Sequence, residues 1–286
     1  MKKLLCSIAA ILSFSAVASC STVTNSHESI FSTSDATTVA ETSTATNNTF
    51  SYQDYAEVLK IYVDEAGLVD YSTLQANREQ LDRFNQSLGR VDPETYASWS
   101  EERQIAFLTN AYNALTLQSI IDQQPIKDSI RDISGVWNRR KFALVGEDKT
   151  LDNIEHDILR KEFNEPRIHV ALVCAAISCP PLRNEPYLAT ALDTQLSDQT
   201  AKFAASPHGL KIDREDRRVY LSSIFKWYGQ DFEETYGVRD KFEGNSKQKA
   251  VLNYFNSALD SPSQEFLERG DYRVKYLDYD WSLNQQ

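Results

Sequence analysis

Cysteine and histidine are the residue types in this 286-residue chain that could act as nucleophile and base at a folded site. A cysteine thiolate carries out acyl and amide transfer when a nearby histidine or a helix N-terminus lowers its pKa. Cys174 paired with His156 or His169 would supply this chemistry. Because Cys174 lies in an apolar run, two alternatives stay open: a buried, inert thiol, and a disulfide between Cys174 and Cys179.

The spacing of His169 and Cys174 disfavours a direct contact between the imidazole and the thiol. Five residues separate them, which places them on opposite faces of a strand, or about 140° apart around a helix. If Cys174 is activated, we expect His156 or a local kink in the chain to be responsible.

Glu155, His156 and Arg160 form a second constellation. His156 and Arg160 are four residues apart, so they share one face of a helix, and Glu155 lies one step around it. A carboxylate that orients an imidazole is what a general base requires. An ion-pair and hydrogen-bond network that ties this helix to the core is the alternative interpretation.

Asn110 and Asn113 lie three residues apart in a strongly apolar helical segment. Buried amides are costly unless their hydrogen bonds are satisfied, so we expect them to brace neighbouring loops or to line a pocket. His208, between Pro207 and Gly209, is expected in a loop. The scattered histidines and cysteines have no recognised zinc spacing, so neither a metal site nor a cofactor is predicted.

The first residues have the pattern of a secretion signal. Lys2 and Lys3 form a positive n-region, and residues 4–17 form an apolar stretch too short to span a bilayer. Val17-Ala18-Ser19-Cys20 resembles the bacterial lipobox. This predicts a signal peptide over residues 1–19 and acylation of Cys20, for example by palmitate, which would anchor the chain to a membrane.

Residues 20–49 are rich in Ser, Thr, Ala and Asn and lack the apolar side chains that would offset the entropy of ordering. We interpret them as a disordered tether, with His27 solvated. Aromatic and aliphatic residues return at Phe50, so residues 50–286 are predicted to form one globular domain.

The charge excludes one class of partner. Loss of the signal removes two lysines and takes the formal net charge from −11 to −13. Nucleic-acid binding needs clustered Lys and Arg, and the one short basic cluster, 138–141, is expected to be a solvated turn. No nucleic-acid partner is therefore predicted.

Periodicity predicts a helix-rich α+β domain with a small, mostly antiparallel sheet. Helices are expected over residues 51–66, 74–88, 100–121, 152–163, 187–205, 222–232 and 248–259. Strands are expected over 141–145, over 210–212 and 219–221 as a hairpin, and over 272–281. Residues 167–177 are interpreted as a buried strand, because Cys179-Pro180-Pro181 blocks a continuing helix. Asp152-x-x-Glu155 is interpreted as a capping box.

Several segments together resemble the family called domain of unknown function 547. They are YAEVL at 55–59, GLVDY at 67–71, AFLTNAYNALTL at 106–117, LDNIEH at 151–156 with LR at 159–160, RIHVALVCAA at 167–176, SCPPL at 178–182, LSSIFKWY at 221–228 with DF at 231–232, and YDWSLN at 279–284. The resemblance implies no established substrate. In relatives from reducing compartments the position of Cys179 can be serine, which would make Cys174 the more fundamental thiol.

Two functions follow. The first is a noncatalytic binding or structural lipoprotein of the cell envelope that recruits an envelope protein or a small ligand. The second is an envelope hydrolase or acyl or amide transferase in a transglutaminase- or papain-like arrangement, with Cys174, His156 or His169, Glu155 and Asn113 as its site. Ser21 after the acylated cysteine favours the periplasmic face of the outer membrane, if the cell has one.

Overall fold

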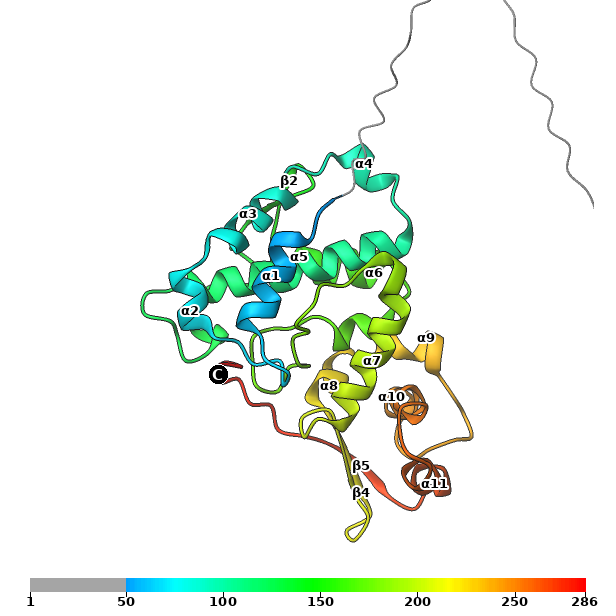
Figure 1. Cartoon of the computed structure of the whole chain (residues 1–286). Coiled ribbons are helices and arrows are strands. Elements are labelled where there is room, and N and C mark those ends of the chain that lie inside the picture. The colour runs from blue at the N-terminus through cyan, green and yellow to red at the C-terminus, as the bar shows by residue number, and fades with distance from the viewer. Residues whose placement is uncertain (1–49) are drawn as a thin grey trace, which may run out of the picture. The chain divides into compact units, whose positions relative to one another are not determined.

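The longest helix, α5 (Glu101–Ile121), is buried over its whole circumference from Ile105 to Ile121. A helix that is buried on all sides must be surrounded by other elements. In the computed structural model, which describes residues 50–286, α5 crosses the upper half of the molecule with other helices packed around it (Figure 1). As predicted, the helix begins after Ser100, whose Oγ accepts a hydrogen bond from the Arg103 N–H at 3.4 Å.

The remaining helices are shorter. The α-helices are α1 (Gln53–Tyr62), α2 (Tyr71–Ala76), α3 (Glu79–Leu88), α4 (Pro93–Ala97), α6 (Arg160–Glu162), α7 (Leu192–Ala205), α8 (Ser223–Tyr228), α9 (Glu233–Tyr236), α10 (Ser246–Asn256) and α11 (Ser261–Arg269). The 3-10 helices are η1 (Ile130–Asp132), η3 (Pro166–Val170), η4 (Ala189–Ala191) and η5 (Gly229–Phe232), and η2 (Asn153–Leu159) is a π-helix.

Two small sheets complete the fold. A hairpin pairs β1 (Phe142–Leu144) with β2 (Glu147–Lys149), and a three-stranded sheet has the order β3 (Leu210–Asp213), β4 (Arg218–Leu221), β5 (Arg273–Tyr276). The β3–β4 pair is antiparallel and the β4–β5 pair is parallel. The helix-rich α+β class with a small, mostly antiparallel sheet is therefore confirmed.

Some predicted boundaries are wrong for local reasons. The stretch 74–88 is two helices, because α2 ends at Ala76 and α3 begins at Glu79. The turn of the first hairpin is Val145-Gly146, with φ angles of 51° and 73°, so Val145 belongs to the turn and not to the strand expected over 141–145. The terminal strand is only β5, since the chain from Leu277 onward leaves the sheet.

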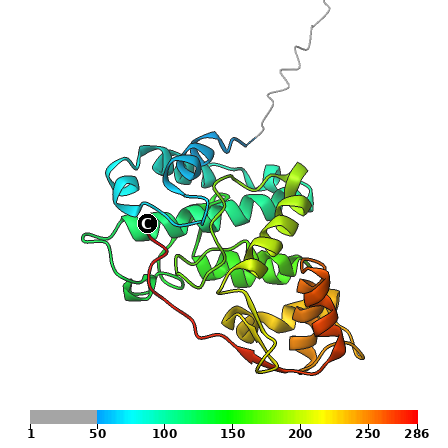
Figure 2. The ribbon, with the colours of Figure 1, turned by 60° about the horizontal axis from the view of Figure 1, so that its bottom comes forward.

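The domain has two hydrophobic cores. One surrounds α5 and includes α1, α2 and α3, with large buried side chains such as Phe84 and Phe107. The other joins α7, α8, α10 and α11 to the three-stranded sheet, with Phe225 and Phe255 at its centre. Both views place the sheet and the last helices at the end of the molecule away from α1 and α3 (Figures 1 and 2).

The C-terminal segment connects the two cores. After β5 it runs back along the molecule toward α1 and α2, as Figure 2 shows. Ile177 N–H donates to the carbonyl of Ser282 at 2.8 Å, and Val69 N–H donates to the carbonyl of Asn284 at 2.9 Å. Residues 277–286 are thus held by hydrogen bonds to both the 174–179 loop and the N-terminal part of the domain.

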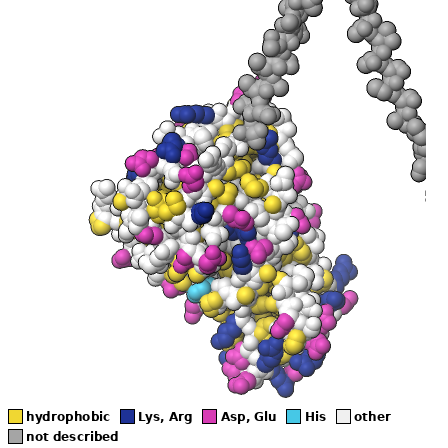
Figure 3. All heavy atoms as spheres, in the orientation of Figure 1, with side chains coloured by type: hydrophobic (Ala, Val, Ile, Leu, Met, Phe, Trp, Pro, Cys, Tyr) yellow, Lys and Arg dark blue, Asp and Glu magenta, His cyan; other side chains and the backbone are white. Residues whose placement is uncertain are grey.

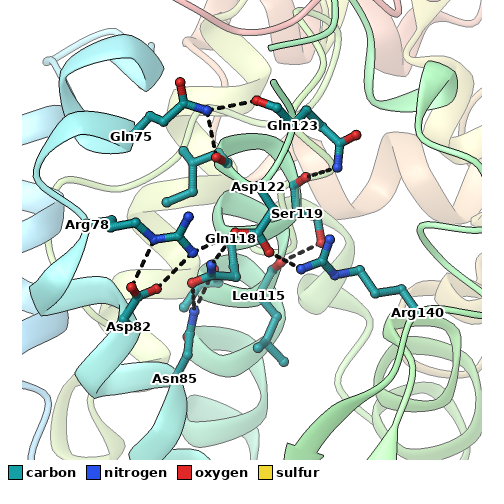
Figure 4. A network of polar contacts seen from close by, with 12 residues as sticks. Gln75, Arg78, Asp82, Asn85, Leu115, Gln118, Ser119, Asp122, Gln123 and Arg140 are labelled. Carbon is teal, nitrogen blue, oxygen red and sulfur yellow. Dashed lines mark hydrogen bonds and ion pairs between the residues drawn. The ribbon is translucent and has the colours of Figure 1, made fainter. Parts of the chain in front are cut away.

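A polar network fastens the end of α5 (Figure 4). Asp122 accepts hydrogen bonds from Arg78 at 2.6 Å and from Gln118 at 2.8 Å, and it also accepts one from Arg140. Burial raises the pKa of Asp122, but these hydrogen bonds and the charge of Arg140 outweigh that effect and leave the pKa below its ordinary value. The network therefore fixes the loop that ends at Arg140 against α3 and α5.

The surface in Figure 3 carries acidic and basic side chains interspersed, with apolar side chains between them. No helix within residues 50–286 has both the length and the apolar character needed to cross a bilayer. The expected signal peptide, the acylation site Cys20 and the tether with His27 lie outside the described residues.

Candidate functional site

A cleft of about 710 Å³ opens where the two cores meet. Its walls come from the loop after α5, from η2, from the 169–179 segment, from α8 and from the C-terminal segment. The lining residues are Tyr112, Arg131, Ile133, Ser134, Gly135, Trp137, Asn138, Arg139, Asp152, Glu155, His156, His169, Leu172, Cys174, Cys179, Ile224, Trp227, Tyr228, Tyr279 and Trp281. The cleft thus collects Cys174, His156, His169 and Glu155, four of the residues that the sequence singles out.

Cys174 and Cys179, which both line the cleft, are joined to each other. Their Sγ atoms lie 2.12 Å apart, within bonding distance. The hydroxyl of Tyr279 lies 3.2 Å from each of the two sulfurs. Within the described residues neither sulfur has a hydrogen bond to an imidazole. In this state Cys174 carries no thiolate for acyl or amide chemistry.

His169 and Cys174 line the same cleft, contrary to the expectation that they face apart. The predicted strand over 167–177 does not form: Pro166–Val170 is the 3-10 helix η3, and the chain then turns irregularly through Ala171–Val173. Ala175 adopts a left-handed conformation with φ of 59°. The periodicity argument fails here because it presupposes one regular element.

His169 is held by a carboxylate that the sequence reasoning did not select. Its Nε2 lies 2.8 Å from Asp231 Oδ2, its side chain is 2% exposed, and its ring stacks on Tyr228 at 4.6 Å and 7°. Arg160 donates to both Asp231 oxygens, at 2.7 and 3.1 Å. Burial raises the pKa of Asp231, but the hydrogen bonds from His169 and Arg160 dominate and place the pKa far below its ordinary value.

The π-helix η2 points acidic side chains into the cleft. Its cap is not the predicted Asp152–Glu155 box: Thr150 Oγ1 accepts from the Asn153 N–H at 3.1 Å, and Asn153 Oδ1 accepts from the Thr150 N–H at 3.0 Å. Asp152 makes no side-chain cap bond, so it and Glu155 face the cleft instead. π-Helical turns are found mostly at functional sites.

His156 lies on the same helix between charged groups. Its Nδ1 is 3.2 Å from Arg160 Nη1 and 3.7 Å from Glu155 Oε1, and its Nε2 is 3.9 Å from Asp152 Oδ1. The i,i+4 contact with Arg160 is present, whereas the distance to Glu155 is too long for a hydrogen bond.

Burial and the charge of Glu155 raise the pKa of the neighbouring Tyr112 well above its ordinary value.

The two asparagines of α5 brace loops. Asn113 donates to the carbonyl of Ala171 at 3.0 Å and accepts from the N–H of Val173 at 2.8 Å. Asn110 makes the same pair of bonds with the backbone of Tyr187, at 2.8 and 2.9 Å. Asn113 therefore holds the segment that leads to Cys174, while Asn110 holds the segment before α7. His208 lies outside the cleft, 3.2 Å from Ser178 Oγ.

Aromatic residues form one wall of the cleft, and the sequence analysis did not identify them as site residues. Trp227 stacks on Trp281 at 5.8 Å and 26°, and Tyr279 lies 4.9 Å from Trp227 and 4.5 Å from Trp281. Trp137 meets Trp281 edge-on at 6.2 Å. The aromatic residues in the segments 227–228 and 279–281 are the sequence feature that could have indicated this wall.

The positive and negative charges of the residues that line the cleft cancel. Arg131 and Arg139 supply two positive charges, and Asp152 and Glu155 supply two negative charges. The guanidinium of Arg131 lies over the Trp281 ring at 5.2 Å. With neutral histidines the formal charge of the lining is zero, whereas the whole chain carries −11. Arg139 and Asn138 belong to the basic cluster that was expected to be a solvated turn.

The family model described as "Protein of unknown function, DUF547" matches residues 96–204. This segment includes Glu155, His156, His169 and Cys174, and the description assigns no activity. Of the aromatic wall, Trp137 lies within the match, whereas Trp227, Tyr279 and Trp281 lie outside it. No curated protein and no solved structure matches the chain. Within residues 50–286, no group of three or more His, Cys, Asp or Glu is arranged to hold a metal ion.

Proposed function

We propose that this chain is a lipid-anchored protein of the cell envelope whose domain binds, without chemical conversion, a small neutral ligand with sugar rings. The aromatic wall formed by Trp137, Trp227, Trp281 and Tyr279 carries this proposal. Large aromatic side chains in a concave site with a few polar groups are the common signature of a small-ligand site.

Exposure of the indoles supports a ligand site. Trp227 is 39% exposed, one of the few large apolar side chains in the described part of the chain with that much contact with water. Trp227 and Trp281 both line the cleft. The C–H face of a sugar ring is flat and apolar, so it can cover an indole and remove that surface from water.

The polar lining suits a neutral ligand with many hydroxyl groups. The guanidiniums of Arg131 and Arg139 donate hydrogen bonds, the carboxylates of Asp152 and Glu155 accept them, and Asn138 does both. A sugar hydroxyl also donates and accepts. Because the charges of the lining cancel, a strongly charged ligand would leave one set of groups unpaired, which is costly on binding.

The states of Cys174 and His169 favour binding over catalysis. Cys174 is bonded to Cys179, and His169 Nε2 is engaged by Asp231 while its ring face lies on Tyr228. A cysteine-dependent hydrolase or transferase would need a free thiolate beside an available imidazole nitrogen. We therefore do not propose thiol catalysis as the main function.

The membrane attachment rests on the lipobox-like sequence that ends at Cys20. Acylation at Cys20 would hold the domain at the membrane, on the periplasmic face of the outer membrane in a diderm cell. Metabolic labelling with a palmitate analogue tests this step: wild type should be labelled and Cys20→Ser unlabelled. Equal labelling of the two proteins would overturn the anchor while leaving the cleft proposal standing.

Calorimetric titration tests the ligand class. Chitotriose, cellotriose and maltotriose are titrated into oxidised wild type, Trp227→Ala and the control Trp99→Phe, whose indole packs beside Phe107 away from the cleft. The proposal expects at least one trisaccharide to bind wild type and Trp99→Phe and to bind Trp227→Ala more weakly. Absence of binding by all three at millimolar concentration, or equal binding by Trp227→Ala, would overturn it.

A further inference from the structure

The disulfide in the cleft lining differs from a buried cross-link in what surrounds its two sulfurs. Both cysteines line the cleft, but Cys174 is partly exposed, whereas Cys179 is only 5% exposed. A small molecule that enters the cleft can therefore reach the sulfur of Cys174 first. Access decides which sulfur of a disulfide a thiolate attacks.

The sulfur of Cys179 has more hydrogen-bond donors around it. It accepts a hydrogen bond from the backbone N–H of Cys174 at 3.0 Å, and the Tyr279 hydroxyl lies 3.2 Å away. Cys174 Sγ has only the Tyr279 contact among the described interactions. Burial raises the pKa of Tyr279, so its phenol keeps the proton and can donate it to a developing thiolate in a hydrogen bond. These donors favour Cys179 as the leaving group.

We propose that Cys174–Cys179 is a thiol–disulfide exchange site, at which a low-molecular-weight thiol that enters the cleft attacks Cys174. The thiolate sulfur forms a bond to Cys174 Sγ, the Sγ–Sγ bond breaks, and its electron pair leaves on Cys179 as a thiolate. A second thiol then attacks the sulfur that came from the first. The products are one disulfide of the small thiol and two cysteines, so two thiols supply the two electrons.

The exchange would change the ligand cleft. The loop between the cysteines holds the C-terminal segment, because Ile177 N–H donates to Ser282 and Asp280 N–H donates to Ser178 Oγ at 2.9 Å. That segment carries Tyr279 and Trp281, two members of the aromatic wall. Opening the bridge removes the cross-link that closes this loop, and with it part of the support of the wall.

Glutathione is the probe for the test. Oxidised full-length protein is incubated with reduced glutathione at pH 8 without denaturant, quenched with acid, alkylated with N-ethylmaleimide and mapped by peptide mass spectrometry. We expect glutathione on Cys174 and maleimide on Cys179, with the reverse pattern on the order of tenfold less abundant. Glutathione on Cys179, an even mixture, or reaction only after unfolding would overturn the proposal.

The role of Tyr279 is tested separately by the rate of the first exchange step. Tyr279→Phe keeps the ring and removes the hydroxyl, so the first exchange step should slow by several-fold while the choice of Cys174 is retained. Tyr220→Phe, on strand β4 and away from the sulfurs, is the matched control and should react at the wild-type rate. An unchanged rate in Tyr279→Phe would remove Tyr279 from the proposal, and a slow rate in both variants would show that the effect is not specific to the contact.

Discussion

The indole rings of Trp227 and Trp281 stack at 5.8 Å and 26° in the lining of the cleft. One residue lies on α8 and the other on the C-terminal segment, so the fold brings together two distant parts of the chain to make this surface. Truncation of either side chain removes half of the stacked pair without touching the hydrogen bonds that hold the domain.

Trp281→Ala should weaken binding of the trisaccharide that wild type binds. Loss of a central aromatic contact typically costs about 2 kcal/mol, which corresponds to roughly a 30-fold rise in Kd. Trp281→Phe, which keeps an aromatic face, should lose much less. Calorimetric Kd values check this, and equal losses in the two variants would indicate that the aromatic face does not contribute.

The stabilisation that Asp231 gives to the domain should be lost in acid. Its pKa in the folded protein lies below the unfolded value of about 4, so its contribution is complete above that pH and is lost as pH falls toward the folded pKa. Asp231→Asn should lower the free energy of unfolding by about 2 kcal/mol at pH 7. The difference in the free energy of unfolding between wild type and Asp231→Asn should narrow below about pH 4.

Urea unfolding from pH 7 to pH 3 measures this difference. Asp240→Asn, at an exposed position, serves as the control and should stay close to wild type throughout. A gap between wild type and Asp231→Asn that widens on acidification would contradict the assigned role of Asp231.

Asn113 should stabilise the domain through its side-chain hydrogen bonds to the backbone. Asn113→Ala leaves the Ala171 carbonyl and the Val173 N–H without their partner in a buried site, which costs about 3 kcal/mol. Asn113→Asp keeps an acceptor for Val173 but loses the donor to Ala171, so it should also destabilise. Thermal unfolding checks both. A variant Tm within experimental error of wild type would refute the bracing role.

Removal of the bridge should destabilise the domain moderately. The cysteines are five residues apart in sequence, and a loop this short contributes about 2 kcal/mol in the chain-entropy model. Cys174→Ser/Cys179→Ser should therefore fold with a lower Tm. Its tryptophan fluorescence should differ from wild type, because the loop supports the segment that carries Trp281. An unchanged spectrum would argue that the bridge does not support the wall.

The parts of the fold that follow from regular patterns could be predicted. The start of α5 at Ser100, the burial of its asparagines and the hairpin of residues 210–221 all depend on periodicity or on one capping side chain. These features are local, so neighbouring residues contain the information that sets them.

The parts of the site that depend on irregular backbone could not be predicted. A 3-10 helix and a turn bring His169 and Cys174 into one cleft, and Thr150 and Asn153 cap η2 while Asp152 and Glu155 line the cleft. The partners Asp231 and Tyr279 come from segments remote in sequence, and no spacing rule links them to His169 or to the cysteines.

The indole N–H signals of the four tryptophans test the central claim most directly. In a proton–nitrogen correlation spectrum, assigned by single Trp→Phe variants, addition of the bound trisaccharide should shift the signals of Trp137, Trp227 and Trp281 and leave Trp99 in place. A spectrum in which no cleft tryptophan shifts, or in which only Trp99 shifts, would contradict a sugar site in this cleft.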